Sequence, residues 1–288
     1  MEQRLNRRRE PRFSRHARAV LLHATPEKLE NLVRVETEYR ARRETVSGMP
    51  YLYFVDVCNY CNLRCPLCPS ALGLFGRDRG MLRLGEYTSI LDRIAPYAFE
   101  VNLHNWGEPF LNPDIFAIIE ATRGRNVMPN VSSNLNTLDE ARAEDVVRSG
   151  LEYLVVSLDG TTRDAYSRYR VGGDFDRVLD TLRAIVSAKR RLHSPTPTIE
   201  WQFLVMRHNE HQMDDARLLG AEIGVDIVRF SPAGLPFDRL TDVEMARPWM
   251  PDGPRFHDFD PGCLTAERTT FDRRHCHYLY RSMTIDPS

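Results

Sequence analysis

Four of the six cysteines in the chain lie close together, in the stretch CNYCNLRCPLC from Cys58 to Cys68. Thiolates gathered in this way bind metal ions or iron–sulfur clusters, or form disulfides in an oxidising compartment. The N-terminus contains no apolar segment followed by a small-residue cleavage site, which argues against a secretory signal. We therefore expect a cytoplasmic protein, in which clustered cysteines stay reduced and bind metal.

The spacing of the cysteines leaves two interpretations open. The four residues form two C-x-x-C pairs that resemble zinc knuckles, but only three residues separate the pairs, whereas structural zinc sites usually have roughly 12 or more. A zinc-binding interaction module without catalysis would use all four thiolates. Alternatively, Cys61, Cys65 and Cys68 hold an iron–sulfur cluster and leave one iron open to a substrate or cofactor. Cys58 is then a small buried thiol at a strand end.

From residue 51 onward, six short apolar segments alternate with helical patterns. Near-continuous apolar runs are typical of parallel strands that are covered on both faces. Strands that alternate with helices predict a parallel sheet, with the active site at the carboxyl ends of the strands. The pattern alone does not separate an open doubly wound sheet from a barrel. The expected strands are 51–57, 99–104, 126–132, 151–158, 198–205 and 225–230.

Helical segments connect these strands. Apolar residues recur at helical spacing from Phe175 to Val186, which predicts an amphipathic helix. The sequences TLDE and NEHQ match capping boxes, so we expect helices to begin after Thr137 and Asn209. After Phe230 the regular pattern fades into stretches rich in proline and glycine, which predict a linker or a loop-built extension.

The run from Cys61 to Cys68 resembles the CxxxCxxC signature of the radical S-adenosylmethionine (radical SAM) superfamily. Further stretches that resemble the family follow in the expected order on predicted strand ends. The resemblance covers residues 50–232 and looks closest to the SPASM-type branch. It implies an α/β fold, a partial (β/α)6 TIM-like barrel with a helical N-terminal segment and a loop-rich C-terminal extension. The supporting stretches are WGEPFLNP (106–113), SSNLNTL (132–138), VSLDG (156–160) and YRVGGDFDRVL (169–179).

The resemblance also implies a chemistry. Cys61, Cys65 and Cys68 would hold one 4Fe–4S cluster, and S-adenosylmethionine (SAM) would chelate the open iron. An electron from the cluster would then cleave SAM to a 5′-deoxyadenosyl radical that abstracts hydrogen from the substrate. An electron donor such as flavodoxin or ferredoxin is implied. The substrate is a small molecule, for example of sugar type, or a peptide; the first 48 residues show no domain for a leader peptide, which favours the small molecule.

The resemblance assigns further residues to SAM. Trp106 replaces the first glycine of the family's GGEP motif, and it either walls the pocket or packs in the core. Leu135 replaces another family glycine. Asp159 and Arg170 have ordinary alternatives as a turn residue and a surface arginine, and His104 either exchanges protons with the substrate or is a core histidine. The residues expected near SAM are Leu67, Gly107, Glu108, Pro109, Asn134, Ser157, Asp159 and Arg170.

Composition limits the partners. The formal net charge is -1, and no apolar run approaches the roughly 20 residues that cross a membrane. Arginines between Arg4 and Arg18 make the N-terminus basic, and we interpret this segment as a solvated arm. Neither nucleic acid nor a membrane is therefore an expected partner.

The C-terminal region resembles the start of a further domain. The sequence CHYLYRSMTIDPS (276–288) is similar to the opening of a SPASM or twitch region, of which the chain contains only the start. Cys263 and Cys276 do not complete a four-thiolate site, so we expect no second cluster. The expected segments are a basic helical segment at 1–48, a radical SAM core barrel at 49–235 and an extension at 236–288.

Overall fold

Seven parallel strands form one sheet in the computed structural model, which describes residues 10–74, 76–233, 243–252, 276 and 278–287. The strand order is β6-β5-β4-β3-β2-β1-β7, so the first six strands follow chain order and the seventh pairs with β1. Helical crossovers keep neighbouring strands parallel. The strands are β1 (Leu52–Val55), β2 (Glu100–Asn102), β3 (Met128–Ser133), β4 (Tyr153–Ser157), β5 (Thr198–Val205), β6 (Ile227–Pro232) and β7 (Ser282–Ile285).

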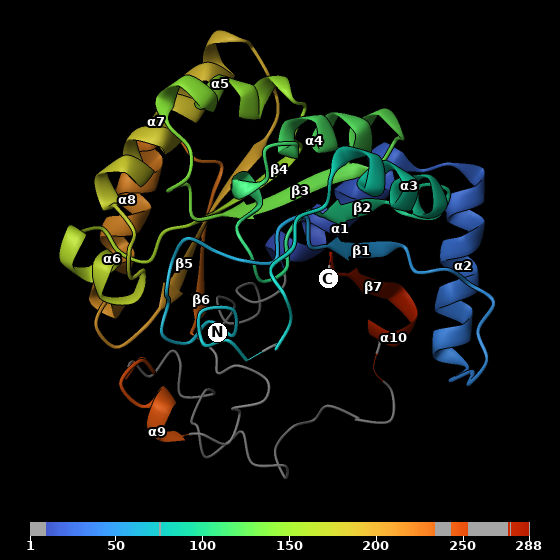
Figure 1. Ribbon diagram of the computed structural model, residues 1–288, viewed down its shortest axis with the longest axis horizontal. Helices are drawn as coiled ribbons and strands as arrows, with labels where there is room; N and C mark the ends of the chain where they lie inside the picture. The colour runs from blue at the N-terminus through green and yellow to red at the C-terminus, as the bar shows by residue number, and fades with distance from the viewer. Residues whose placement is uncertain (1–9, 75, 234–242, 253–275, 277, 288) are drawn as a thin grey trace, which may run out of the picture.

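Helices α3 to α8 connect successive strands and lie along one side of the sheet (Figure 1). This order confirms the predicted parallel α/β fold. None of the described helices is long and apolar enough to span a membrane. The helices are α1 (Glu10–His23), α2 (Pro26–Arg40), α3 (Leu84–Ile94), α4 (Ile115–Gly124), α5 (Glu140–Arg148), α6 (Arg163–Tyr169), α7 (Phe175–Arg191), α8 (Met213–Ile223), α9 (Val243–Ala246) and α10 (Tyr278–Arg281), with short 3-10 turns η2 (Pro109–Leu111) and η3 (Glu210–Gln212).

Apolar side chains fill the layer between the sheet and these helices. Val101, Val131 and Leu154 are fully buried in this core. Helix α7 begins at Phe175, as its spacing predicts, and buries Leu182 completely. Full burial of such a side chain contributes about 1.5–3 kcal/mol to folding.

The inner face of the sheet carries polar side chains, which the apolar character of the predicted strands did not indicate. Asn130 of β3 donates to Asn102 of β2 at 2.5 Å. Arg229 of β6 pairs with Glu200 and donates to Gln202 Oε1 at 2.5 Å, both on β5. Alternation along each strand places these residues opposite the apolar core. Because buried polar groups need partners, the strands are linked through this network.

Helix α1 closes the base of this inner face. Its Ala19 packs in a cluster with residues from the starts of β3 and β4. Arg15 lies 3.3 Å from the buried carboxylate of Glu100, and Arg18 donates to Thr198 Oγ1 at 3.1 Å. The expectation of a solvated arm is therefore wrong for Arg15 and Arg18, because acceptors at the strand starts bind them. The first nine residues lie outside the described residues.

One of the two predicted helix starts is wrong. Helix α5 follows Asp139, whose carboxylate accepts a hydrogen bond from the backbone N–H of Arg142 at 3.0 Å, so Thr137 is not its cap. The other start is confirmed in position, since η3 begins directly after Asn209, but the Asn209 side chain makes no capping bond for it. Its side-chain oxygen accepts from the backbone N–H of Met206 at 2.7 Å, since a loop contact competes for the same acceptor.

The C-terminal segment contributes a strand to the main sheet, although its sequence predicts only an extension. β7 pairs with β1 over its whole length. Beyond it, Asp286 accepts a hydrogen bond from Asn59 at 3.1 Å and forms an ion pair with Arg77. These contacts tie the C-terminal segment to the loop that carries the cysteines. Cys263 lies outside the described residues, and Cys276 is a free thiol.

Candidate active site

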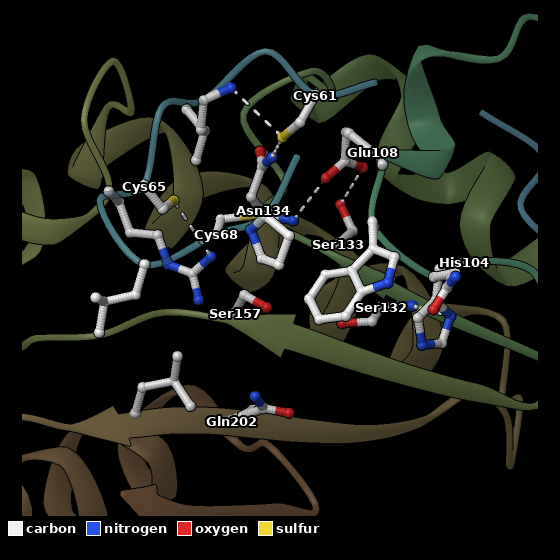
Figure 2. Close-up of a pocket in the computed structure, with 18 of the residues that line it drawn as sticks. Cys61, Cys65, Cys68, His104, Glu108, Ser132, Ser133, Asn134, Ser157 and Gln202 are labelled. Carbon is white, nitrogen blue, oxygen red and sulfur yellow. Dashed lines mark hydrogen bonds between the residues drawn. The ribbon is translucent and has the colours of Figure 1, made fainter. Parts of the chain in front are cut away.

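A cavity of about 390 Å³ lies at the carboxyl ends of the central strands, where barrel enzymes hold their active sites. Figure 2 shows Cys61, Cys65 and Cys68 on one side of it, with Ser157 of β4 and Gln202 of β5 on the other. The cysteine loop follows β1 directly. Chain segments far apart in sequence therefore meet around one space.

The cavity thiols have different hydrogen-bond partners. Cys61 Sγ accepts from the backbone N–H of Leu63 at 3.4 Å and from the Asn134 amide at 3.6 Å. Cys65 Sγ accepts from Arg170 Nη1 at 3.8 Å. Burial raises the pKa of Cys61 to about 12, and it also raises the pKa of Cys65, where Arg170 opposes the rise. Both thiols are therefore protonated at neutral pH, and a bound metal group must displace their protons.

The donor set fits an iron–sulfur cluster better than a single zinc ion. A zinc ion needs each thiolate sulfur at about 2.3 Å from the metal, so its ligands must converge on one point. Among the described residues, no three His, Cys, Asp or Glu side chains converge in this way. A four-iron cluster is larger, so its thiolates need not converge on one point. Cys58 is buried away from the cavity, and its Sγ donates to the carbonyl of Tyr60 at 3.4 Å. The zinc interpretation with four thiolates thus lacks geometric support.

Gly107 allows the loop after β2 to pack against the cysteine loop. A Cβ atom at this position would lie 1.7 Å from the carbonyl oxygen of Cys58. Next to this contact, the backbone N–H of Glu108 donates to the carbonyl of Tyr60 at 2.9 Å. Trp106, which replaces the family's first glycine, lines the cavity.

The Glu108 carboxylate joins the loops after β2 and β3. Its Oε1 accepts from Ser133 Oγ at 2.7 Å and from the backbone N–H of Phe110 at 3.2 Å. Its Oε2 accepts from the backbone N–H of Asn134 at 2.9 Å. Burial raises the pKa of Glu108, and these hydrogen bonds oppose the rise. Glu108 lines the cavity, but both of its oxygens already have protein partners.

Leu135 occupies a turn that favours glycine. Its φ is +58°, in the left-handed region that side chains with a Cβ rarely adopt. Its side chain is nevertheless fully buried in the core, and its backbone N–H donates to Ser133 Oγ at 2.9 Å. Leucine in place of the family's glycine therefore has two opposing effects. Its backbone conformation is unfavourable, whereas the burial of its side chain is favourable.

Asp159 and Arg170 form a buried ion pair. Arg170 Nε donates to Asp159 Oδ2 at 2.6 Å, and Asp159 Oδ1 accepts from the backbone N–H of Leu204 at 2.7 Å. Burial raises the pKa of Asp159, and Arg170 opposes the rise. Because both carboxylate oxygens have protein partners, Asp159 positions Arg170, which lines the cavity.

The other polar residues of the cavity wall are uncharged, and they lie among apolar residues such as Leu63 and Leu204. His104 Nδ1 accepts from the backbone N–H of Ser132 at 3.0 Å. Burial, with a further contribution from Arg15, lowers the pKa of His104 to about 4, so its ring is neutral at physiological pH. Gln202 accepts from Arg229 through Oε1, which leaves its amide NH2 as the donor at the cavity (Figure 2). Sequence reasoning missed Ser132 and Gln202, although the polar residues Glu200 and Gln202, which alternate with apolar ones in TIEWQFLV, were a weak signal.

Most residues expected near SAM lie around this cavity. Two of them do not line it: Asp159 supports Arg170 from behind, and Pro109 is buried at the start of η2. Leu67 presents a largely buried apolar side chain beside the thiols. The expected residues that do line the cavity are Leu67, Gly107, Glu108, Asn134, Ser157 and Arg170.

A partial α/β barrel with three thiols beside a cavity at its strand ends defines a class of cofactor-dependent enzymes. The chain belongs to the radical SAM superfamily, whose family model matches residues 55–199. The cofactors of that family are a 4Fe–4S cluster and SAM. The motif resemblance found in the sequence is thereby confirmed.

Relatives and solved structures agree with this assignment. PqqA peptide cyclase of Gluconobacter oxydans is 24% identical over 65% of this chain and 50% of its own length. GTP 3′,8-cyclase of Lactiplantibacillus plantarum is 30% identical over 44% of this chain and 39% of its own length. The chain thus spans about half the length of the curated relatives it matches, or less.

The fold has a counterpart among solved structures. Streptococcus suis SuiB bound to S-adenosylmethionine superposes with a TM-score of 0.60 at 15% identity, over 96% of this chain and 68% of that chain. SuiB has also been solved with its precursor peptide SuiA, where the TM-score is 0.60 over 90% of this chain and 62% of that chain. This likeness confirms the predicted partial barrel.

Proposed function

We propose that this chain is a radical SAM enzyme that modifies a peptide, with one 4Fe–4S cluster on Cys61, Cys65 and Cys68. The observation that carries the proposal is the position of these thiols on one wall of a cavity at the strand ends. Membership of the superfamily supports the same cofactors. A low-potential electron donor such as flavodoxin or ferredoxin belongs to the proposal.

The residues of the chain would bind and orient the reactants. When bound, the cluster and SAM would supply the radical chemistry that removes a hydrogen atom from the substrate. Leu67 offers an apolar surface to the adenine, and the Ser157 hydroxyl at the end of β4 offers a hydrogen bond to the ribose or carboxylate. The Arg170 guanidinium group provides a positive charge for the carboxylate of SAM. Glu108 fixes the loops around these groups.

A peptide suits the described cavity better than a nucleoside triphosphate. A triphosphate needs several free cations, but Arg170 is the charged base among the described lining residues and is already paired with Asp159. His104 is neutral, whereas Ser132 and Gln202 suit amide and hydroxyl groups. The names of PqqA peptide cyclase and of the SuiB–SuiA complex add support. On this support we propose a peptide in place of the small molecule that the sequence favoured.

The cofactor part of the proposal is tested anaerobically. The protein is reconstituted with iron and sulfide, mixed with SAM and dithionite, and 5′-deoxyadenosine is quantified by chromatography. We expect 5′-deoxyadenosine from the wild type and from Cys58→Ala, and none from the triple variant Cys61→Ala/Cys65→Ala/Cys68→Ala. Purified protein that carries zinc, with equal dependence on Cys58, would overturn the proposal.

The substrate part needs a separate measurement. Deuterated peptide mixtures and deuterated sugar mixtures are each incubated with the reconstituted protein, and deuterium in 5′-deoxyadenosine is measured by mass spectrometry. Transfer from the peptides is the expected result. Transfer from the sugars alone would keep the radical chemistry and reject the peptide.

A further inference from the structure

We propose that Arg170 raises the reduction potential of the cluster by donating a charged hydrogen bond to the thiolate of Cys65. The inference rests on the proposed function, since it requires a cluster on Cys61, Cys65 and Cys68. It assigns Arg170 a role in tuning the cluster, in addition to any contact with SAM.

The contact places a cation at one cluster ligand and not at another. Arg170 Nη1 donates to Cys65 Sγ over 3.8 Å, with the arginine side chain only 13% exposed. Cys61 receives its described hydrogen bonds from uncharged donors, the Leu63 backbone and the Asn134 amide. The charged donor is therefore specific to the Cys65 side of the site.

Both ends of the contact are held in place. On the arginine side, the fully buried Asp159 binds Nε at 2.6 Å and is itself anchored by the backbone N–H of Leu204. On the cysteine side, the residue before Cys65 is tied to the residue after Arg170, because the backbone N–H of Arg64 donates to the carbonyl of Val171 at 2.9 Å. The guanidinium group thus has little freedom to turn away from the sulfur.

The physical effect has a definite sign. Reduction adds one electron to the cluster, and a nearby cation with a hydrogen bond to a thiolate ligand stabilises the added negative charge. Low solvent exposure weakens screening of this interaction. Asp159 opposes the effect, but Arg170 lies between its carboxylate and Cys65 in the chain of contacts. The net effect of the arginine is therefore to make reduction easier.

The test measures the cluster potential, not turnover. Reconstituted wild type and variants are titrated electrochemically without SAM, and the reduced cluster is monitored by electron paramagnetic resonance. For Arg170→Gln we expect at least a tenfold loss in the equilibrium constant for one-electron reduction, a shift of about 59 mV to more negative potential. Arg168→Gln removes the same charge from an exposed position two residues earlier and is expected to change the constant less than threefold. Equal potentials for the two variants would overturn the proposal.

A second measurement covers the case in which Arg170→Gln does not assemble a cluster. Wild-type protein labelled with ¹⁵N in its arginine guanidinium groups is reduced, and nuclear coupling to the cluster is recorded by pulsed electron paramagnetic resonance. A ¹⁵N coupling that persists in Arg168→Gln supports the contact, and its absence rejects it. Wild type that binds no cluster would reject the proposed function itself, whereas a cluster without arginine coupling would reject only the role of Arg170.

Discussion

The carbonyl oxygen of Cys58 fills the space in which a side chain at Gly107 would begin. An ideal Cβ at Gly107 would lie 1.7 Å from that oxygen, and the adjacent backbone of Glu108 donates to Tyr60. The cysteine loop and the loop after β2 are therefore fixed against each other through backbone atoms. Neither side can move aside as a flexible side chain would.

This contact predicts a large effect of Gly107→Ala. The added methyl group must push two backbone segments apart, so we expect a loss of about 3 kcal/mol or more in the free energy of unfolding. Gly85→Ala is the matched control, since a Cβ there meets nothing within 4 Å in helix α3, and it should gain about 0.5–1 kcal/mol. Urea denaturation of the cluster-free proteins measures both. Similar stability of the two variants would contradict the prediction.

The strands could be predicted from sequence because their signal is local. Short apolar runs between helical patterns placed all six core strands, and β5 runs from Thr198 to Val205 as expected. The seventh strand was missed, because Ser282–Ile285 has no such run and is defined by pairing with β1 across the whole chain. The start of helix α5 was also missed, because Asp139 and not Thr137 accepts the capping hydrogen bond from the Arg142 backbone.

The site was predictable only where a motif names its residues. CxxxCxxC identifies three thiols, but nothing local shows that Arg170 reaches Cys65 from 105 positions away. The same holds for Gln202, whose orientation depends on Arg229 in the next strand. Polar residues whose orientation depends on partners far away in the sequence leave no periodic pattern in the sequence. The residues of the cavity wall could therefore be identified only from the structure.

Leu135→Gly tests the backbone conformation of the turn after β3. Loss of a buried leucine typically costs about 2–5 kcal/mol, whereas relief of a left-handed backbone returns about 1–2 kcal/mol. The loss exceeds the relief, so we expect net destabilisation. Leu138→Gly is the control, because Leu138 is equally buried without a positive φ. Its cost should be greater by about 1–2 kcal/mol; equal costs in denaturation experiments would argue against the strained conformation.

Arg229→Met tests the polar inner face. Glu200 is 2% exposed and would lose its cation, which for a buried pair costs about 3–5 kcal/mol. The double variant Arg229→Met/Glu200→Gln should recover part of this loss, since Tyr153 can still donate to the amide oxygen in place of the carboxylate. Arg163→Met breaks an exposed pair with Asp176 and should leave the unfolding midpoint nearly unchanged. A double variant no more stable than Arg229→Met would show that the charge of Glu200 is not the cause.

The neutral ring of His104 predicts a pH-dependent contribution to stability. Burial lowers its pKa from 6.5 to about 4 on folding, so the folded state binds fewer protons than the unfolded chain between these values. A base whose pKa falls on folding destabilises the fold as pH drops below its unfolded pKa, by about 1.4 kcal/mol per pH unit. His104→Asn keeps an acceptor for the Ser132 backbone and removes the titration. The stability advantage of the wild type over this variant should therefore shrink by about 1 kcal/mol between pH 6.5 and 5.5, because the unfolded ring is only half protonated at pH 6.5. It should remain constant from pH 7.5 to 8.5. A difference that stays the same across the acidic range would mean that folding does not lower the pKa of His104.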